Sequence, residues 1–410
     1  MLQGKNILLG VTGGIAAYKT CDLASMLMKA GAVVNVIETE NAAKFVTPLT
    51  FDALTHQRTV VDTFDRQHSY EIEHIALSDK ADAVLVAPAS ADIIAKLANG
   101  LADDMLTTTI LAMDRPKLIA PAMNTRMYEN PVTQHNLDLL RGYGWEIIEP
   151  VSGHLACGTS GKGKMASPER LFLALEHAIA YQKDLTGKRI LVSAGPTREA
   201  LDPVRYLTNH SSGRMGYAIA KVAADRGARV TLVSGPTELN PSPYVECIPI
   251  ESAEEMFHAV SQRACVQDAV IMAAAVADFR PASVADNKIK KKEGESLSSL
   301  SLEGTKDILE WLGRHKPYHQ LLCGFSMETE HLLENSRKKL EKKNLDLIAA
   351  NSLKESGAGF GVDTNILTLI CKDKEEKLPL MSKEEAANVL LDRLFSLKKK
   401  PSGTDMYRPY

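Results

Sequence analysis

The sequence predicts an α/β protein made of two doubly wound, mainly parallel three-layer domains. Three observations predict this class. Short apolar runs alternate with amphipathic segments along the chain, the first forty residues show a strand, a glycine turn, a helix and a strand, and this pattern starts again near residue 187. Nearly continuous apolar strands that alternate with helices are typical of parallel strands buried on both faces of a sheet.

The elements can be assigned in chain order. Residues 6–10 and 33–37 are expected to be parallel strands that flank a helix over 16–30. Helices over 168–183 and 383–397 are expected to close the two domains, which span 1–186 and 187–398 and are followed by a disordered tail over 399–410. The further strands are expected at 83–87, 118–120, 190–193, 230–233, 270–275 and 345–350.

The two halves repeat one architecture. The segment Gly4-Lys-Asn-Ile-Leu-Leu opens the first half and Gly187-Lys-Arg-Ile-Leu-Val opens the second, an offset of 183 residues. A later matching pair, around Gly31 and Gly227, is offset by 196 residues, so the second half carries a 13-residue insertion between its first strand and first helix. Ligands of open α/β sheets bind at the carboxyl ends of the strands, so this insertion is expected to serve function.

Composition excludes several classes of protein. Of the 410 residues, 45% are apolar and 24% charged, and the net charge of −3 is that of an ordinary globular protein. No apolar run reaches the ~18 residues of a membrane span, and no basic excess indicates a nucleic-acid partner, so neither a membrane nor a nucleic acid is expected. The six cysteines show no paired spacing, which favours a reducing, cytoplasmic setting.

In the first half, the turn at Gly13 and Gly14 precedes a helix and is suited to bind a phosphate. The dinucleotide fingerprint G-x-G-x-x-G does not fit the glycines of this turn. Glu38 ends the second strand and suits a ribose-binding acid, so a nicotinamide dehydrogenase remains an alternative, while the neighbouring Thr39 would serve a phosphate.

Other polar residues of the first half follow predicted strands or lie in loops. Ser90 and Asn124 each follow a strand at the carboxyl edge of the sheet. Cys157 lies in a segment with four glycines in eleven residues, which has the composition of a lid. From the residues alone, base rates favour a turn residue at Asn124, a loop thiol without a role at Cys157 and a surface or strand-edge residue at His74.

In the second half, Arg205 and Asn209 lie in the insertion ahead of a helix, which suits an anionic ligand. Asp278 follows a strand and can meet a nucleotide or its Mg²⁺. Lys288 can neutralise a triphosphate, although the adjoining lysine run over 290–292 is equally a solvated surface. Lys339 and Lys343, four apart on a predicted helix, share one face.

Four motifs of the first half, T-G-G-I-A-A-Y-K at 12–19, P-A-S-A-D at 88–92, P-A-M-N-T-R-M at 121–127 and A-C-G at 156–158, together resemble the flavin-containing cysteine decarboxylase family. The resemblance implies a flavodoxin-like fold that binds FMN between the subunits of a trimer. It also implies that His74 is the catalytic base, that Asn124 holds the substrate carboxylate and that Cys157 is the acid. The FMN contacts that it implies are Gly13, Gly14, Thr39 and Ser90. Two positions depart from the commonest motif, Asp92 in place of Asn and Tyr128 in place of Trp.

The second half resembles phosphopantothenoylcysteine synthetase through A-G-P-T-R-E-A-L-D-P-V-R with N-H-S-S-G-R-M-G, A-A-V-A-D at 274–278, K-I-K-K at 288–291 and K-K-N-L-D-L-I-A-A-N at 342–351. This resemblance implies a Rossmann-like domain that pairs into dimers and uses CTP with Mg²⁺, for which Asp278 is the candidate ligand. It implies that Arg205 and Asn209 handle the acyl intermediate and that Lys288 stabilises phosphate charge. The CTP-site positions that it implies are Ala273, Ala274, Ala275, Asp278, Lys288, Lys306, Asp307, Ile308, Leu309, Phe325, Lys339 and Lys343.

The whole chain thus resembles the bacterial bifunctional synthetase/decarboxylase family of coenzyme A biosynthesis. The resemblance implies that the second half joins 4′-phosphopantothenate to cysteine through an acyl cytidylate made from CTP. It implies that the first half then decarboxylates the product, 4′-phosphopantothenoylcysteine, to 4′-phosphopantetheine with FMN. A homo-oligomer is expected, with trimers of the first domain and dimers of the second, which combine in a dodecamer. A nicotinamide dehydrogenase and a regulatory flavoprotein without turnover remain alternatives.

Overall fold

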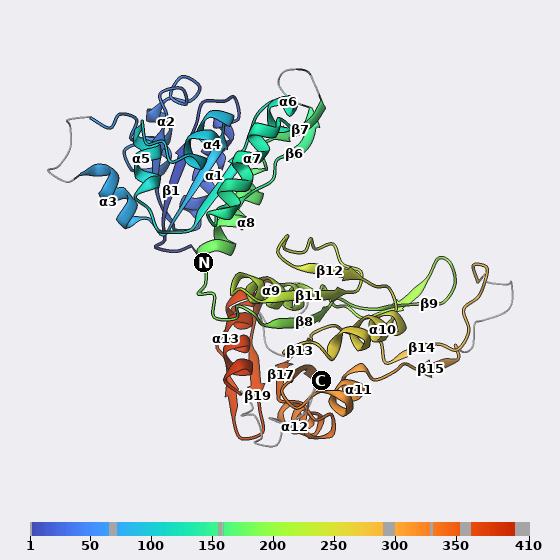
Figure 1. Ribbon diagram of the computed structural model, residues 1–410. Coiled ribbons are helices and arrows are strands. Elements are labelled where there is room, and N and C mark those ends of the chain that lie inside the picture. The colour runs from blue at the N-terminus through green and yellow to red at the C-terminus, as the bar shows by residue number, and fades with distance from the viewer. Residues whose placement is uncertain are drawn as a thin grey trace, which may run out of the picture. The chain divides into compact units, whose positions relative to one another are not determined.

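The computed structural model describes residues 2–64, 72–154, 158, 160–289, 300–328, 331–352 and 362–397. The chain divides into two compact units, with the division between Gln182 and Lys183 (Figure 1). The predicted tail over 399–410 lies outside the described residues. In the described ranges, no helix combines the length and the apolar character that crossing a membrane requires.

The first unit is a five-stranded parallel sheet with the strand order β2-β1-β3-β4-β5. Its strands are β1 (Asn6–Val11), β2 (Val33–Glu38), β3 (Ala83–Ala89), β4 (Lys117–Pro121) and β5 (Glu146–Ile147), with the antiparallel pair β6 (Val151–His154) and β7 (Ser160–Lys164). Its helices are α1 (Ala17–Lys29), α2 (Pro48–Thr55), α3 (Glu73–Lys80), α4 (Ala91–Ala98), α5 (Met105–Leu111), α6 (Thr125–Tyr128), α7 (Pro131–Gly142) and α8 (Pro168–Ile179).

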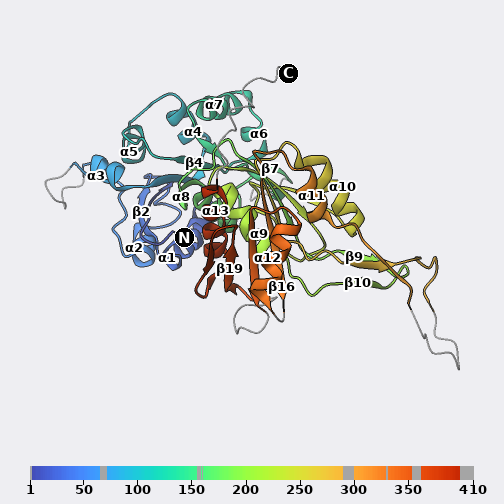
Figure 2. The ribbon, with the colours of Figure 1, turned by 90° about the horizontal axis from the view of Figure 1, so that it is seen from below.

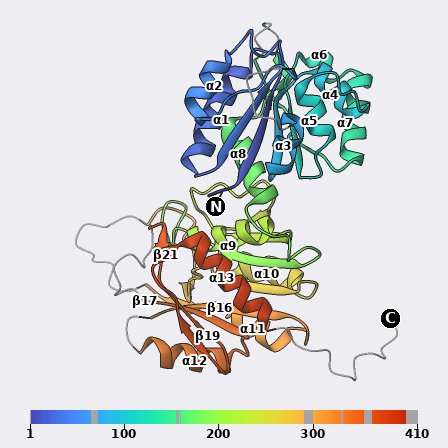
Figure 3. The ribbon, with the colours of Figure 1, turned by 90° about the vertical axis from the view of Figure 1, so that its left-hand side faces the viewer.

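Both faces of this sheet are covered, because alternate residues of each strand point to opposite sides. Leu9 of β1 belongs to a core formed with α1, α2 and α8, and its neighbour Leu8 belongs to a core formed with α4, α5 and α7. Figure 3 shows α1 and α2 on one side of this sheet and α4, α5 and α7 on the other. The predicted three-layer doubly wound fold is confirmed for this unit.

The second unit contains an eight-stranded sheet with the order β12-β11-β8-β13-β16-β17-β19-β20. The strands run parallel from β12 to β17, and β19 and β20 are antiparallel. The sheet strands are β8 (Arg189–Ala194), β11 (Arg229–Ser234), β12 (Glu246–Pro249), β13 (Ala269–Met272), β16 (Leu321–Glu328), β17 (Leu347–Ser352), β19 (Leu367–Ile370) and β20 (Glu375–Lys377). Shorter pairs are β9 (Arg198–Ala200) with β10 (Tyr206–Thr208), β14 (Phe279–Pro281) with β15 (Leu302–Gly304), and β18 (Thr364–Asn365) with β21 (Met381–Ser382).

Helices again cover both faces of the sheet. One face packs against α10 (Ala253–Ala264), α11 (Ile308–His315) and α12 (Leu332–Lys342), which share a core with alternate residues of β8, β13, β16 and β17. The other face carries α9 (Arg214–Asp225) and α13 (Lys383–Ser396), which lie alongside each other (Figure 3). The predicted three-layer α/β class is confirmed here too, with antiparallel strands at one edge.

The repeat of architecture is also confirmed, since β2-β1-β3-β4 and β11-β8-β13-β16 have the same order and direction. Residues 12–16 connect β1 to α1, whereas residues 195–213 connect β8 to α9 and contain the β9–β10 hairpin. We call the β9–β10 hairpin, β14, β15 and residues 282–289 the arm, which extends from one side of the second unit (Figures 1 and 2). One expectation is wrong: the strand expected over 270–275 ends at Met272, and Ala275 instead forms an isolated bridge with Pro196.

Candidate active sites

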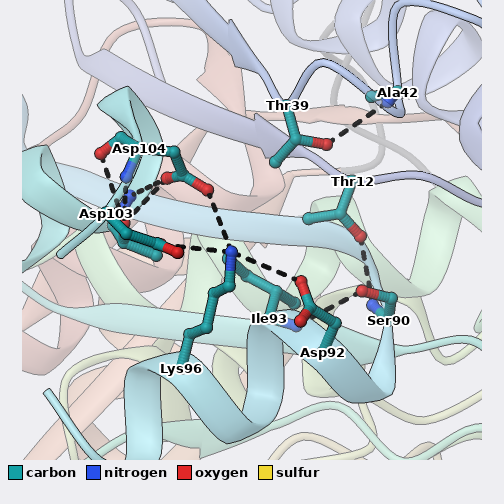
Figure 4. A network of polar contacts seen from close by, with 10 residues as sticks. Thr12, Thr39, Ala42, Ser90, Asp92, Ile93, Lys96, Asp103 and Asp104 are labelled. Atoms are coloured by element: carbon teal, nitrogen blue, oxygen red, sulfur yellow. Dashed lines mark hydrogen bonds and ion pairs between the residues drawn. The ribbon is translucent and has the colours of Figure 1, made fainter. Parts of the chain in front are cut away.

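Three loops meet at the carboxyl edge of the first sheet (Figure 4). The Thr12 hydroxyl donates to the Pro88 carbonyl at 2.7 Å and accepts from the Ser90 N–H at 3.1 Å, which joins the loops after β1 and β3. The Ser90 Oγ caps α4, and the Thr39 Oγ1 accepts from the Ala42 N–H at 3.3 Å. Because the Ser90 and Thr39 hydroxyls accept here, each still has a hydrogen to donate to a ligand oxygen.

The glycine turn leaves room for a ligand. A Cβ on Gly13 would lie 2.6 Å from the Cβ of Asn41, so the loops after β1 and β2 touch, whereas a Cβ on Gly14 would meet no atom within 4 Å. The first turn of α1 has neither a side-chain cap nor an acidic residue. Its N–H groups therefore favour an anion such as a phosphate. The residues of this edge fit the phosphate and hydroxyl-rich chain of a flavin mononucleotide.

Asn124 lies at the same edge, because the Ala122 N–H donates to the Ala89 carbonyl at 2.9 Å. Its Oδ1 accepts from the Arg126 N–H at 2.9 Å and caps α6. The β6–β7 hairpin packs on this turn: the Met123 N–H donates to the Gly163 carbonyl at 3.0 Å. A Cβ on Gly163 would lie 2.3 Å from the Met123 carbonyl oxygen, so only glycine fits this position.

Tyr128 anchors the hairpin to the unit. Glu149 accepts from the Tyr128 hydroxyl at 2.7 Å, from the Lys162 Nζ at 2.8 Å and from the Arg141 guanidinium at 2.6 Å. Burial alone would raise the pKa of Glu149, but the hydrogen bonds from Lys162 and Tyr128 outweigh burial and hold this pKa below its usual value. Tyr128 stands where the resembled motif commonly has Trp. Its hydroxyl therefore has a structural role, the hydrogen bond to Glu149.

Asp92, the other departure from the motif, faces a cation. Its carboxylate lies 3.6 Å from the Lys96 Nζ, which also lies 3.1 Å from Asp103 and 3.8 Å from Asp104 (Figure 4). Burial would lower the pKa of Lys96, but the hydrogen bond from its ammonium to Asp103 and the charges of the other two carboxylates outweigh burial and raise this pKa. An Asn at position 92 would leave one fewer carboxylate around this lysine.

The structure does not bring all predicted residues of the first half together. Gly13, Gly14, Thr39, Ser90 and Asn124 share one edge of the sheet. His74 lies on α3, which packs on α5 and is on the opposite side of the unit from α6 in Figures 1 and 2. Cys157 lies outside the described residues.

Glu38 does not suit the dehydrogenase alternative. Its side chain is completely buried beside Asp52, and neither carboxylate oxygen has a hydrogen-bond partner among the described residues. Burial, with a smaller effect of the Asp52 charge, raises the pKa of Glu38 to about 7. A buried carboxyl cannot reach a ribose, so the expectation of a ribose-binding acid at this position is wrong.

The second unit has a cavity of about 680 Å³ at the carboxyl edge of its sheet. Its volume is in the range of small-molecule sites. Asn209 and eleven of the twelve residues expected at the nucleotide site line it. The eleven residues are Ala273, Ala274, Ala275, Asp278, Lys306, Asp307, Ile308, Leu309, Phe325, Lys339 and Lys343.

Lysines and a carboxylate make one wall of this cavity. Asp307 caps α11 and pairs with the Lys343 Nζ at 2.6 Å, while the Lys339 Nζ donates to the Phe325 carbonyl at 3.0 Å. Burial would raise the pKa of Asp307, but the hydrogen bonds from Lys343 and the Glu310 N–H, together with the charges of Lys343 and Lys339, outweigh burial and lower this pKa. The Lys306 Nζ pairs with Glu254 of α10 at 2.7 Å. This wall carries more positive than negative charge and suits a phosphorylated ligand.

Asn209 also lines this cavity and holds the turn after β13. Its Nδ2 donates to the Ala275 carbonyl at 3.0 Å and to the Val276 carbonyl at 3.2 Å. The side-chain oxygen of Asn209 is therefore the atom that remains for a ligand. The exposed carboxylate of Asp278 lies two residues further along the same turn.

The residues that the structure describes contain no group of three or more His, Cys, Asp or Glu side chains that could hold a metal ion. Asp278 is exposed in the cavity and can supply one carboxylate. Mg²⁺ commonly binds through one or two carboxylates together with substrate phosphates and waters. The cavity therefore fits a Mg²⁺ ion that arrives with a nucleotide better than a resident ion.

Arg205 and Lys288 do not line the cavity of their own chain. Both lie on the arm, where the Arg205 guanidinium pairs with Asp202 and donates to the Ile289 carbonyl at 2.7 Å. Lys288 is exposed. Within one chain, the structure therefore does not bring these two cations together with the other predicted nucleotide-site residues.

The cavity also contains residues that were not predicted, among them Asn351, Asn365 and Lys383. Asn351 ends the motif at 342–351, and its buried Oδ1 has no partner in the described part of the chain. Its position at the carboxyl end of β17 is the signal that could have identified it. Asn365 lies in β18 and Lys383 begins α13, and the Lys383 Nζ donates to the Thr364 carbonyl at 2.8 Å. No local pattern marks these two residues.

Comparison with known proteins gives matches over both units. Residues 1–179 match the family described as Flavoprotein, and residues 185–397 match the family described as DNA/pantothenate metabolism flavoprotein C-terminal domain. The coenzyme A biosynthesis bifunctional protein CoaBC of Bacillus subtilis (strain 168) is 49% identical over 403 residues, which cover 97% of this chain and 98% of that protein. The protein of the same name from Haemophilus influenzae is 45% identical over 399 residues, covering 97% and 99%. A crystal structure of the C-terminal domain of such a protein is 46% identical, with a TM-score of 0.44, and covers 52% of this chain and 96% of that one.

Proposed function

We propose that this chain, which belongs to the family of coenzyme A biosynthesis bifunctional proteins, carries out two consecutive reactions of that pathway. The second unit acts as a phosphopantothenate–cysteine ligase that uses CTP, and the first unit acts as a phosphopantothenoylcysteine decarboxylase. The observation that carries this proposal is the identity of 49% over nearly the whole length of both proteins.

The ligase reaction needs activation because oxide is a poor leaving group from a carboxylate. The carboxylate of 4′-phosphopantothenate attacks the α-phosphate of CTP, which gives an acyl cytidylate and pyrophosphate. The amine of cysteine then displaces CMP. Lys339 and Lys343 lie where they can neutralise the nucleotide phosphates, and Asp278 holds Mg²⁺ together with those phosphates. The Asn209 side chain contacts the acyl intermediate.

The decarboxylase reaction uses FMN, which supplies an electron acceptor that makes the loss of CO₂ from the substrate possible. The first turn of α1 holds the phosphate of FMN, and the Thr39 and Ser90 hydroxyls donate to its oxygens. Asn124 holds the substrate carboxylate. His74 takes up the proton of the substrate thiol, and the Cys157 thiol returns a proton to the carbon that has lost CO₂.

The active protein is a homo-oligomer in this proposal. His74 and Asn124 lie on opposite sides of one unit, so two copies are needed if both residues serve one site, as in a trimer of first units. Arg205 and Lys288 lie on the arm, outside the cavity of their own chain, which favours a dimer of second units. Trimers and dimers together give a dodecamer. We place the enzyme in the cytoplasm, because the described cysteines are free thiols.

Purified full-length protein tests this function. We expect a yellow preparation with flavin absorption, release of pyrophosphate from CTP that requires both cysteine and phosphopantothenate, and release of CO₂ from the ligated product. Reduction of a nicotinamide cofactor in place of flavin absorption would support a dehydrogenase. Flavin without either reaction would support a regulatory flavoprotein.

A further inference from the structure

Asp202 lies in the loop between β9 and β10, on the arm. Its side chain is 0% exposed, whereas that of its partner Arg205 is 47% exposed. A fully enclosed carboxylate on a projecting hairpin is unusual, because burying a charge costs free energy unless the charge is paired and hydrogen-bonded. The contacts of Asp202 therefore explain its position.

Five hydrogen bonds end on this carboxylate. Its Oδ1 accepts from the backbone N–H groups of Val204 at 2.8 Å and Arg205 at 2.9 Å. Its Oδ2 accepts from the Arg205 Nε at 3.0 Å and Nη2 at 2.5 Å, and from the Ile289 N–H at 3.1 Å. The Arg205 hydrogen bond, helped by the backbone donors and opposed by burial, holds the pKa of Asp202 well below its usual value. These contacts therefore favour the ionised form of the carboxylate.

These contacts connect two segments that are 87 residues apart. Ile289 directly follows Lys288, so one carboxylate fixes both the Arg205 guanidinium and the backbone beside the Lys288 side chain. Arg205 strengthens the connection through its 2.7 Å bond to the Ile289 carbonyl. The Nη1 group of Arg205 and the ammonium of exposed Lys288 remain for a ligand.

Flexible cations bind an anion weakly when each must first be ordered, since long arginine and lysine side chains lose rotamer entropy on binding. We propose that Asp202 is a positioning residue of the ligase, which sets Arg205 and Lys288 as a pair so that both reach the same phosphorylated ligand. The inference rests on the proposed ligase function. Asp202 itself does not touch the ligand and acts only through its two cationic neighbours.

The first test is Asp202→Asn in the full chain, which preserves the size of the side chain and removes its charge. We expect kcat/KM of the ligase for phosphopantothenate to fall about 100-fold, as for other misplaced catalytic groups, with KM for cysteine unchanged. Asp202→Glu, which restores the charge, should recover part of the loss. The decarboxylase rate of the same chain should be unchanged, and an unfolding transition of the second unit like that of the parent shows that the altered unit is folded.

The second test measures coupling. If Asp202 acts through Arg205 and Lys288, adding Asp202→Asn to the double variant Arg205→Ala with Lys288→Ala should slow the ligase no further. An additional loss in this triple variant would show that Asp202 contributes by another route and would overturn the inference. If Asp202→Asn fails to fold, Arg205→Lys is used instead, since it preserves the charge and loses the two-pronged contact. An unchanged ligase rate in Arg205→Lys overturns the inference as well.

The matched control is Glu303→Gln, which breaks the exposed 2.7 Å pair of Glu303 with Arg280 on the same arm. Its ligase rate should stay within about twofold of the parent, because exposed pairs contribute little. Absence of CTP-dependent ligation in the unaltered chain would remove the proposed function itself. Normal ligation in both the parent and Asp202→Asn would remove only the role of Asp202.

Discussion

The two units share one order of strands and helices, yet they present their ligands with different surfaces. Five residues follow β1 and form a tight glycine turn, so the first unit offers an open edge of backbone N–H groups and hydroxyls. Nineteen residues follow β8 and contribute the β9–β10 hairpin to the arm, and the second unit has a cavity of about 680 Å³ lined in part by charged side chains. The long loop supplies Asn209 to this cavity, whereas the short glycine turn of the first unit leads into an uncapped helix N-terminus.

The two units also differ in how many of their predicted site residues lie together within one chain. The cavity of the second unit gathers most of its predicted residues in one chain but lacks the two arm cations. The first unit gathers its phosphate-binding and amide groups and leaves His74 on a distant helix. Under the proposed function, the first site takes its base and the second its pair of cations from elsewhere.

The largest expected effect is the loss of one activity without the other when a predicted catalytic residue of one unit is replaced. Cys157→Ser should lower decarboxylation by about 100-fold or more, since a hydroxyl is a much weaker acid than a thiol, and should leave ligation unchanged. Asn209→Asp should do the reverse, because it replaces the Nδ2 donor to the Ala275 and Val276 carbonyls by a repelled carboxylate. Both rates are measured on each full-length variant. Loss of both activities in one folded variant would show that the two sites are not independent.

Gly163→Ala should damage only the first unit. Its Cβ would lie 2.3 Å from the Met123 carbonyl oxygen, and its φ of +149° is unfavourable for alanine. We expect a destabilisation of about 1–3 kcal/mol and a lower decarboxylase rate with normal ligation. Thermal unfolding and both assays measure these effects. The control is Gly153→Ala on β6, whose Cβ would meet nothing nearer than the Lys164 side chain at 3.5 Å, and equal damage from this variant would contradict the packing argument.

Glu38→Gln tests the buried carboxyl of the first unit. Because the pKa of Glu38 rises to about 7 on folding, its contribution to stability is complete below pH 4.5 and is lost as the pH rises through 7. The variant should match the parent near pH 4. Above pH 7 it should be more stable than the parent, with a free energy of unfolding that is higher by an amount on the order of 1–3 kcal/mol, which thermal unfolding at each pH measures. The exposed Glu40→Gln serves as the control. A difference between Glu38→Gln and the parent that does not change with pH would contradict this assignment.

Tyr128→Phe should have the smallest effect. It removes one hydrogen bond to Glu149, while those from Lys162 and Arg141 remain, so a loss of about 1 kcal/mol is expected. The decarboxylase rate should fall severalfold and the ligase rate should not change. If the two rates fall together, the contact does not act through the β6–β7 hairpin.

Much of the fold could be predicted because its signals are local. The glycine turn before α1, the apolar runs of β1, β2 and β3, and the repeat at Gly187 each lie within a few residues, and the structure agrees with them. The strand expected to reach residue 275 failed because the same apolar composition continues beyond Met272, where the chain turns towards Pro196. Composition records apolar character and does not record where a chain leaves a sheet.

The sequence by itself determined the order of elements, the two units, and which polar residues follow strands, since strand ends of a parallel sheet meet at one edge. Tertiary structure alone decided that Glu38 is buried and that Arg205 and Lys288 lie outside the cavity. It also decided that Asp202 connects Arg205 to the backbone beside Lys288. The reason is physical. Periodicity reports which face of an element is apolar, whereas burial of a charge and pairing across 87 residues depend on how separate segments pack.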